Sequence, residues 1–211
     1  FLPEAFINLL AVLGWNDGTE QELFTKEELI EKFSIERVHS GGAKFDYEKA
    51  KWFNHEWIKK LPVTHYLPEV KQLFEQKGIT IADEAMLEKA MELVKDRCHL
   101  LPDFVQQGAF FFASPASFDL DAIKPRWNSS KSLFFSEVIR SFGLSALWTA
   151  PELEHSFKEI AAAHQLKPGE VLLPLRIMLV GGKFGPHVFD IAELLGKEET
   201  IARIRHVLSL L

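Results

Sequence analysis

Two lysines precede a tryptophan between Glu48 and Phe53, and such a group could bind a nucleic acid. Lys49 and Lys51 could neutralise phosphates, while the ring of Trp52 could stack on a base. On a helix, Trp52 lies about 100° around the axis from Phe53 and therefore off the apolar stripe. The same position would also allow Trp52 to pack against a neighbouring helix, so the residues alone leave both interpretations open.

Two arginines and a glycine-rich loop form a second group of candidates. Arg176 lies inside the apolar run 171–180, where a buried or half-buried guanidinium needs a partner. Arg97 flanks the apolar face of its predicted helix, where it could bind a ligand, form an ion pair or extend its charge to water. The loop 181–186 could bring main-chain groups close to a ligand, because glycine leaves the backbone uncovered. An ordinary turn between helices is the alternative for this loop.

The sequence contains none of the common catalytic or cofactor motifs. It has no phosphate-binding loop, no G-x-G-x-x-G, no H-E-x-x-H and no G-x-S-x-G. The eight histidines do not stand at metal-ligand spacing. The single cysteine, Cys98, falls on an apolar helix face and is interpreted as a buried structural thiol. We therefore predict no catalytic residue and no metal site.

The charge of the chain limits how it could bind a nucleic acid. The formal net charge is −6 over 211 residues, which argues against binding by bulk electrostatics and requires a local basic face. No run of apolar residues is long enough for a membrane span, and no secretory signal is recognisable, so no membrane partner is expected. One cysteine excludes an internal disulfide, and a cytoplasmic location is expected.

Helical periodicity runs through almost the whole chain and must position these candidates. A first helix is expected to bury one face formed by Phe6, Leu9, Leu10 and Leu13. Capping boxes are predicted at Thr25 and at Thr149, each with a glutamate three residues later. Strand patterns are absent, so we predict an all-α chain with two to three small helical bundles in an elongated array.

Several blocks of the sequence resemble one known family, the bacterial glutamyl-tRNA synthetases. Similar blocks occur at both ends of the chain and, more weakly, in the middle; they read LPEAFINLLAVLGW, FSIERVHSGGAKFDYEKAKWFNHEWI, LEKAMELVKDRCHLL and KPGEVLLPLRIMLVGGKFGPHVFDIAELLGKEETIARI. The catalytic H-I-G-H-like and K-M-S-K-R-like motifs of the family are missing. The resemblance therefore implies the C-terminal, tRNA-recognition portion of such a synthetase.

The resemblance also implies a division into three parts. Residues 1–62 would be a stem-contact domain, and residues 63–112 and 113–211 would be two anticodon-binding subdomains. The whole synthetase would use ATP and Mg²⁺ to attach glutamate to tRNA(Glu) through a glutamyl-adenylate. This portion would need no cofactor and would be inactive alone. Its implied partners are tRNA(Glu) and the catalytic domain of the same polypeptide, with no DNA.

The resemblance also implies which single residues contact the tRNA. Lys49 and Trp52 fall where the family contacts the D-stem region. Arg97 falls where some members place an arginine against the third anticodon base, and Arg176 where an arginine meets the first. The loop expected to pack on the anticodon contains Gly185, Pro186 and Val188. A helical protein-interaction module without tRNA specificity is the alternative, and whether the whole enzyme also charges tRNA(Gln) stays open.

Overall fold

The computed structural model describes residues 1–39, 41–42 and 44–211, and over these ranges it contains helices and no strand. The prediction of an all-α chain is confirmed for these residues. The α-helices are α1 (Pro3–Val12), α2 (Lys26–Lys32), α3 (Tyr47–Lys60), α4 (Leu67–Gln76), α5 (Glu84–Val94), α6 (Asp103–Gly108), α7 (Ser129–Leu144), α8 (Ala150–Ala163), α9 (Pro168–Val180), α10 (Val188–Leu195) and α11 (Lys197–Leu208). Short 3₁₀ turns join several of them: η1 (Ile35–Arg37), η2 (Val63–His65), η3 (Lys95–Arg97), η4 (Ala109–Phe111), η5 (Leu120–Ala122) and η6 (Lys124–Arg126).

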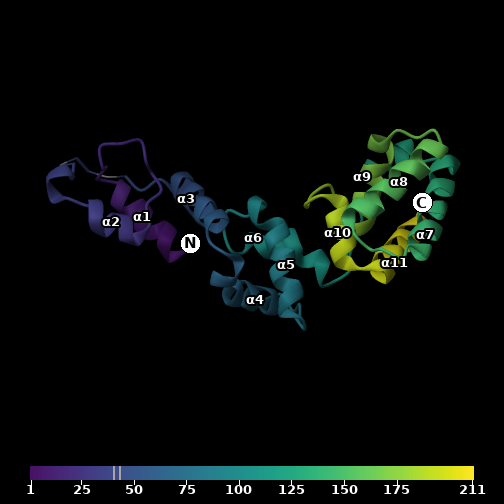
Figure 1. The fold of residues 1–211 in the computed structure, drawn as a ribbon, viewed down its shortest axis with the longest axis horizontal. Coiled ribbons are helices and arrows are strands. Elements are labelled where there is room, and N and C mark those ends of the chain that lie inside the picture. Colours follow the sequence, from purple (N-terminus) through teal and green to yellow (C-terminus); the bar gives the residue numbers. More distant parts are fainter. Residues whose placement is uncertain (40, 43) are drawn as a thin grey trace.

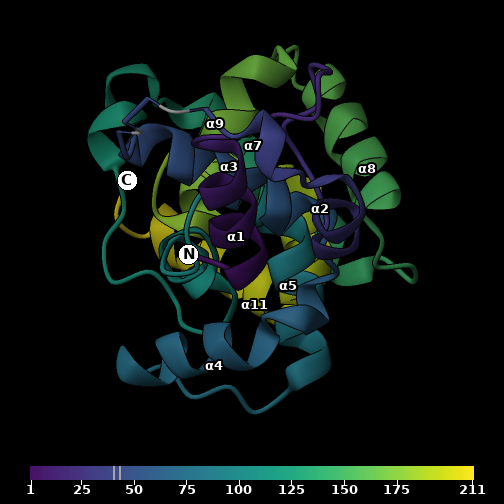
Figure 2. The same cartoon turned by 90° about the vertical axis from the view of Figure 1, so that its left-hand side faces the viewer.

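The helices form an elongated array, as predicted. Helices α1 to α3 lie at one end, α4 to α6 in the middle and α7 to α11 at the other end (Figure 1). Seen along the long axis from the α1 end, α4 runs across the bottom of the molecule (Figure 2), and its buried Val70 and Phe74 belong to the core shared with the other helices. The two chain ends lie in different groups of helices.

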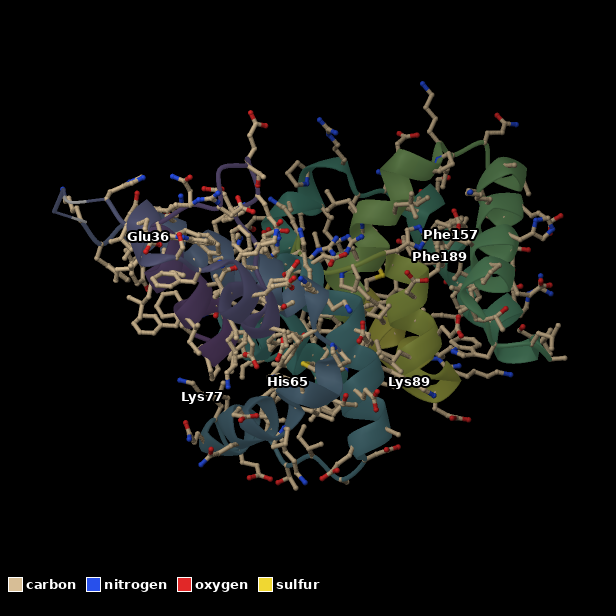
Figure 3. All side chains as sticks on the ribbon, turned by 60° about the vertical axis from the view of Figure 1, so that its left-hand side comes forward. Glu36, His65, Lys77, Lys89, Phe157 and Phe189 are labelled. Atoms are coloured by element: carbon tan, nitrogen blue, oxygen red, sulfur yellow. The ribbon has the colours of Figure 1, made fainter. Side chains whose placement is uncertain are left out.

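One apolar core nevertheless continues through all three groups. A single cluster of buried side chains extends from Leu2 to Val207. In the last group, Phe157 of α8 and Phe189 of α10 meet edge to face at 5.4 Å between ring centroids (Figure 3). Because the core is continuous, it supplies no boundary of its own, and the divisions after residues 62 and 112 stay predictions.

The first helix buries a different face from the one expected. Leu9 is buried, but Phe6 and Leu10 are 42% and 51% exposed. The buried face instead carries the polar Asn8, because its amide satisfies main-chain groups of the following loop. The prediction of one inward face through Phe6 and Leu10 is therefore wrong.

Of the two predicted capping boxes, only the first forms. The Thr25 hydroxyl accepts from Glu28 N, and the Glu28 carboxylate accepts from Thr25 N at 2.7 Å. Thr149 makes no side-chain cap. At α8 the main-chain N–H of Ala150 donates to Glu193 Oε2 of α10 instead, so a tertiary contact replaces the local cap.

Candidate nucleic-acid interface

Helix α3 presents the first group of candidate residues. The Asp46 carboxylate caps this helix by accepting from Glu48 N and Lys49 N at 2.9 and 3.1 Å. Trp52 is 40% exposed, and its ring contacts buried Phe53 edge to face at 4.9 Å. Part of the indole thus packs on the core, while the exposed part is accessible to a ligand.

Both lysines beside Trp52 already have carboxylate partners. Lys49 Nζ lies 2.6 Å from Glu22, and Lys51 Nζ lies 2.8 Å from Glu48. The hydrogen bond to Glu48 raises the pKa of Lys51 above its ordinary value. These pairs are solvent-exposed and therefore weak, so a phosphate could displace the carboxylates.

Arg97 ends the 3₁₀ turn η3, and the segment that follows is hydrogen-bonded to α3. Asn54 Nδ2 donates to His99 O at 2.6 Å, and His55 Nδ1 lies 2.8 Å from Cys98 O. The imidazoles of His55 and His99 stack at 4.5 Å. Arg97 is exposed, and it thus extends from a segment whose backbone is fixed to α3.

Arg176 of α9 holds the loop between α9 and α10. Its Nη1 donates to the carbonyls of Phe184, Gly185 and Pro186 at 3.0, 3.1 and 2.6 Å. Burial lowers the pKa of Arg176 from its ordinary value, and the nearby charge of Arg97 lowers it further. Within the described ranges, neither arginine forms an ion pair with a carboxylate, although the charge of Arg97 acts on Arg176.

The backbone of this loop depends on glycine at two positions. Gly181 and Gly185 have φ angles of 84° and 97°, a region that residues with a side chain rarely adopt. A Cβ on Gly185 would lie 3.6 Å from both Arg176 Nη1 and the Phe110 ring, and a Cβ on Gly181 only 2.6 Å from Ser117 O. The loop is therefore closely packed against the residues that precede and support it, Phe110, Ser117 and Arg176.

The three predicted loop residues differ in accessibility. Gly185 is partly exposed, whereas Pro186 is buried and Val188 is only 2% exposed. The structure brings Gly185 and Pro186 to Arg176, with Arg97 nearby, but keeps Lys49 and Trp52 apart on α3 (Figure 1). Their roles toward RNA stay predictions.

Sequence analysis missed the most exposed apolar side chain of this loop. Phe184 is 40% exposed and lies edge to face with Phe110 at 6.1 Å. The pattern that could have revealed it is an aromatic residue next to a lysine inside a glycine-rich turn, where no helix face exists to bury the ring.

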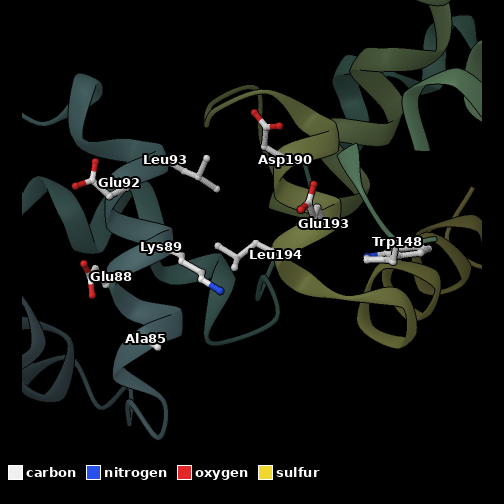
Figure 4. A pocket seen from close by; sticks show the side chains of 9 residues that line it. All are labelled: Ala85, Glu88, Lys89, Glu92, Leu93, Trp148, Asp190, Glu193 and Leu194. Carbon is white, nitrogen blue, oxygen red and sulfur yellow. The ribbon is translucent and has the colours of Figure 1, made fainter. Parts of the chain in front are cut away.

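A cleft of about 780 Å³ lies between α5 and α10 (Figure 4). Lys89 and Leu93 of α5 point across it toward Leu194 of α10. Four carboxylates also line the cleft, those of Glu88, Glu92, Asp190 and Glu193. Because carboxylates repel phosphates, this cleft is an unsuitable place for RNA.

The described residues contain no cluster of three or more His, Cys, Asp or Glu side chains suited to a metal ion. No helix among them combines the length and apolarity that crossing a bilayer requires. Cys98 is buried as predicted, and burial raises the pKa of its thiol to about 12, which makes it a poor nucleophile.

Comparison with known proteins places this geometry in context. Residues 47–208 match the family described as Anticodon binding domain. The glutamate–tRNA ligase of Flavobacterium johnsoniae is 40% identical over 211 residues, which cover all of this chain and 42% of that protein. The glutamate–tRNA ligase of Porphyromonas gingivalis is 35% identical, with coverage of 100% and 41%. The chain thus spans about two fifths of the length of the curated relatives it matches.

Solved structures of glutamate–tRNA ligases share the fold. A crystal structure from Elizabethkingia meningosepticum, in complex with its amino acid, superposes with a TM-score of 0.89 at 36% identity. That from Elizabethkingia anophelis gives a TM-score of 0.86 at 37% identity. Each comparison covers 99% of this chain and 41% of the other. The resemblance to glutamyl-tRNA synthetases is confirmed over the whole chain.

Proposed function

Because the chain belongs to the anticodon-binding domain family, we propose that it is the tRNA-recognition part of a glutamate–tRNA ligase. The whole ligase would activate glutamate with ATP and Mg²⁺ as glutamyl-adenylate and transfer it to the 3′ end of tRNA(Glu). This chain would bind and position the tRNA, without a cofactor of its own. Its partners would be tRNA(Glu) and the catalytic domain, and its location would be the cytoplasm.

The observation that carries this proposal is the loop 181–186, which Arg176 holds by three hydrogen bonds while the charge of Arg97 acts on the same guanidinium. Arg176 uses Nη1 for the loop, and no acceptor for its Nε or Nη2 is found within the described ranges. Those N–H groups can donate to the edge of an unpaired base, which is how single-stranded loops are read. Two guanidiniums without carboxylate partners also favour an anionic ligand.

The exposed group on α3 supplies the second contact of the proposal. Lys49 and Lys51 would approach phosphates of the tRNA stem, and Trp52 would pack beside them. Such contacts set the register of the tRNA and carry no sequence information. In this proposal, residues 1–62 contact the stem, and residues 63–112 and 113–211 bind the anticodon.

Binding of tRNA by this chain, titrated at low and moderate salt, tests the proposal. Neutralised phosphates release counterions, so the affinity should fall steeply as salt rises. tRNA(Glu) should bind more tightly than a tRNA with an exchanged anticodon. Equal binding of the two tRNAs would mean that the chain contacts the stem but does not read the anticodon. Absence of binding at low salt would favour a protein-interaction module instead.

A further inference from the structure

The loop between α9 and α10 presents one aromatic ring, that of Phe184, to solvent. Single exposed apolar side chains are common, so exposure alone says little. Phe184 differs because its ring is supported from two sides. Atoms Cε1 and Cδ1 of the ring lie over Gly182, where a Cβ would approach them to 2.9 and 3.0 Å. The edge of the buried Phe110 ring meets it from another side.

The backbone beneath this ring is fixed by several hydrogen bonds. Arg176 Nη1 donates to the carbonyl of Phe184 itself and to the next two carbonyls. At the start of the loop, Gly181 O accepts from Asp119 N at 2.8 Å. The ring is therefore presented in a defined position, and little conformational entropy remains to be lost when a ligand stacks on it.

Two cations are part of, or hydrogen-bonded to, the loop that carries the ring. Lys183 precedes it and forms only an exposed pair with Asp119 at 3.2 Å, and the unpaired guanidinium of Arg176 lies beneath the loop. A flat apolar ring beside cations is the combination that binds an unpaired nucleobase together with its phosphate.

We propose that Phe184 forms a stacking subsite for one unpaired nucleobase, with Gly182 as the positioning residue whose lack of a Cβ leaves room for the ring. The inference rests on the proposed function and extends it, because it names a contact made by the face of a base rather than by its edge. Every base has such a face, so this contact contributes affinity with little dependence on base identity.

An RNA hairpin carrying the anticodon stem and loop of tRNA(Glu) is the probe for this subsite. A fluorescent purine analogue replaces each loop base in turn. Stacking on Phe184 should change the fluorescence at one loop position when the chain binds. Phe184→Leu keeps an apolar side chain but removes the ring, and should weaken hairpin binding about 5- to 150-fold and abolish that fluorescence change. Phe184→Tyr keeps the ring and should bind like the original.

The salt dependence separates stacking from loss of charge. Phe184→Leu removes no charge, so the slope of affinity against salt should stay unchanged. If the original chain binds the hairpin and Phe184→Leu binds equally well, the stacking subsite is wrong while the proposed function stands. If the original chain does not bind, both are wrong.

Gly182→Ala tests the positioning role without removing the ring. Its Cβ would collide with the ring and displace it, so hairpin binding should weaken and the fluorescence change should shrink. Gly169→Ala is the matched control, because a Cβ there meets no atom within 4 Å. Unchanged binding by Gly182→Ala, with the ring contact intact, would contradict the positioning role.

Discussion

The guanidinium of Arg176 both fixes a loop and carries a charge that no carboxylate compensates within the described residues. Three carbonyls accept from its Nη1, which accounts for an arginine inside an apolar run. A structural arginine of this kind would usually be neutralised by a carboxylate. Here its neighbour in charge is Arg97 instead. Arginines without a carboxylate partner are typical of a site that binds an anion.

At the residue scale, Cys98 gives a prediction of pH dependence. Burial raises the pKa of its thiol from 9.0 to about 12. A raised native pKa means that the folded state holds the proton more tightly than the unfolded state. The resulting stability is fully present below about pH 9 and is lost as the pH rises toward 12. Between these limits, the free energy of unfolding should fall more steeply for the original chain than for Cys98→Ala in urea titrations.

Parallel slopes for the two proteins would contradict this assignment of Cys98. A second readout is thiol modification. A native thiol with this pKa should react slowly with an alkylating reagent at pH 8, and the reaction should become fast in denaturant.

Lys49 supports a second residue-scale prediction. Lys49→Ala should weaken binding of all tRNAs about equally and lower the salt slope by about 1, since one phosphate contact is lost. Lys77→Ala is the control, because Lys77 is an exposed lysine at the end of α4 with no ion pair among the described residues (Figure 3). A loss that depends on the anticodon, or an equal loss in both variants, would remove Lys49 from the stem contact.

Residue identity predicted some of these features and not others. Arg176 stands out because a charged residue conflicts with the apolar run around it. The burial of Cys98 could be predicted because a thiol suits the apolar face of a helix. Phe184 does not stand out, because its exposure depends on a loop conformation set by Gly181, Gly185 and Arg176 together. The burial of Val188 is likewise decided by packing of α10, which no local pattern encodes.

At the element scale, α1 shows where periodicity misleads. Both Leu9 and Leu10 fit an amphipathic pattern, but only Leu9 is buried. Asn8 lies in the core because its side chain accepts from Phe24 N and Trp57 Nε1 at 3.0 and 3.2 Å. Helical periodicity is judged from apolar residues alone. It therefore assigns a polar residue such as Asn8 to the exposed face, even when hydrogen bonds allow its burial.

The orientation of α1 can be tested with two neighbouring leucines. Leu9→Ala should lower the free energy of unfolding by about 2–5 kcal/mol, because it leaves a cavity in the core. Leu10→Ala should change it by less than about 0.5 kcal/mol. Urea denaturation of the two variants measures the difference. Similar losses for both would mean that Leu10 is also buried.

Asn54 of α3 joins three segments and gives a further prediction. Its Oδ1 accepts from Leu2 N at 2.6 Å, and its Nδ2 donates to His99 O at 2.6 Å. Asn54→Leu would leave both main-chain groups unpaired, at about 1–3 kcal/mol for each. Gln106→Leu, at an exposed position of α6, is the control and should be nearly neutral in thermal melts. Equal melting temperatures would show that these hydrogen bonds contribute nothing to stability.

Helix ends were predictable only where the cap is local. The box at Thr25 is encoded within four residues and forms. At Thr149 the same pattern fails, because Glu193 from a later helix satisfies the Ala150 N–H at the start of α8. A capping pattern in the sequence describes only hydrogen bonds between residues close in the chain, and it contains no information about partners from distant helices.

At the scale of the whole molecule, charge is distributed so that one region is suited to RNA. The net charge is −6, and the cleft between α5 and α10 carries four carboxylates. The charge of Arg97 nevertheless acts on Arg176, and among the described residues neither arginine pairs with a carboxylate. Repulsion elsewhere and attraction here would restrict how a tRNA approaches. Composition predicted the need for a local basic face, but only the fold shows that the charges of Arg97 and Arg176 influence one another.

The most direct test of anticodon reading is a thermodynamic cycle between Arg176 and the first anticodon base. Affinities are measured for the original chain and for Arg176→Ala, each with tRNA(Glu) and with a version exchanged at that base. The exchange should cost the original chain about 1–3 kcal/mol and should cost Arg176→Ala much less. An equal cost in both proteins, or none in the original chain, would contradict the assignment of base reading to Arg176.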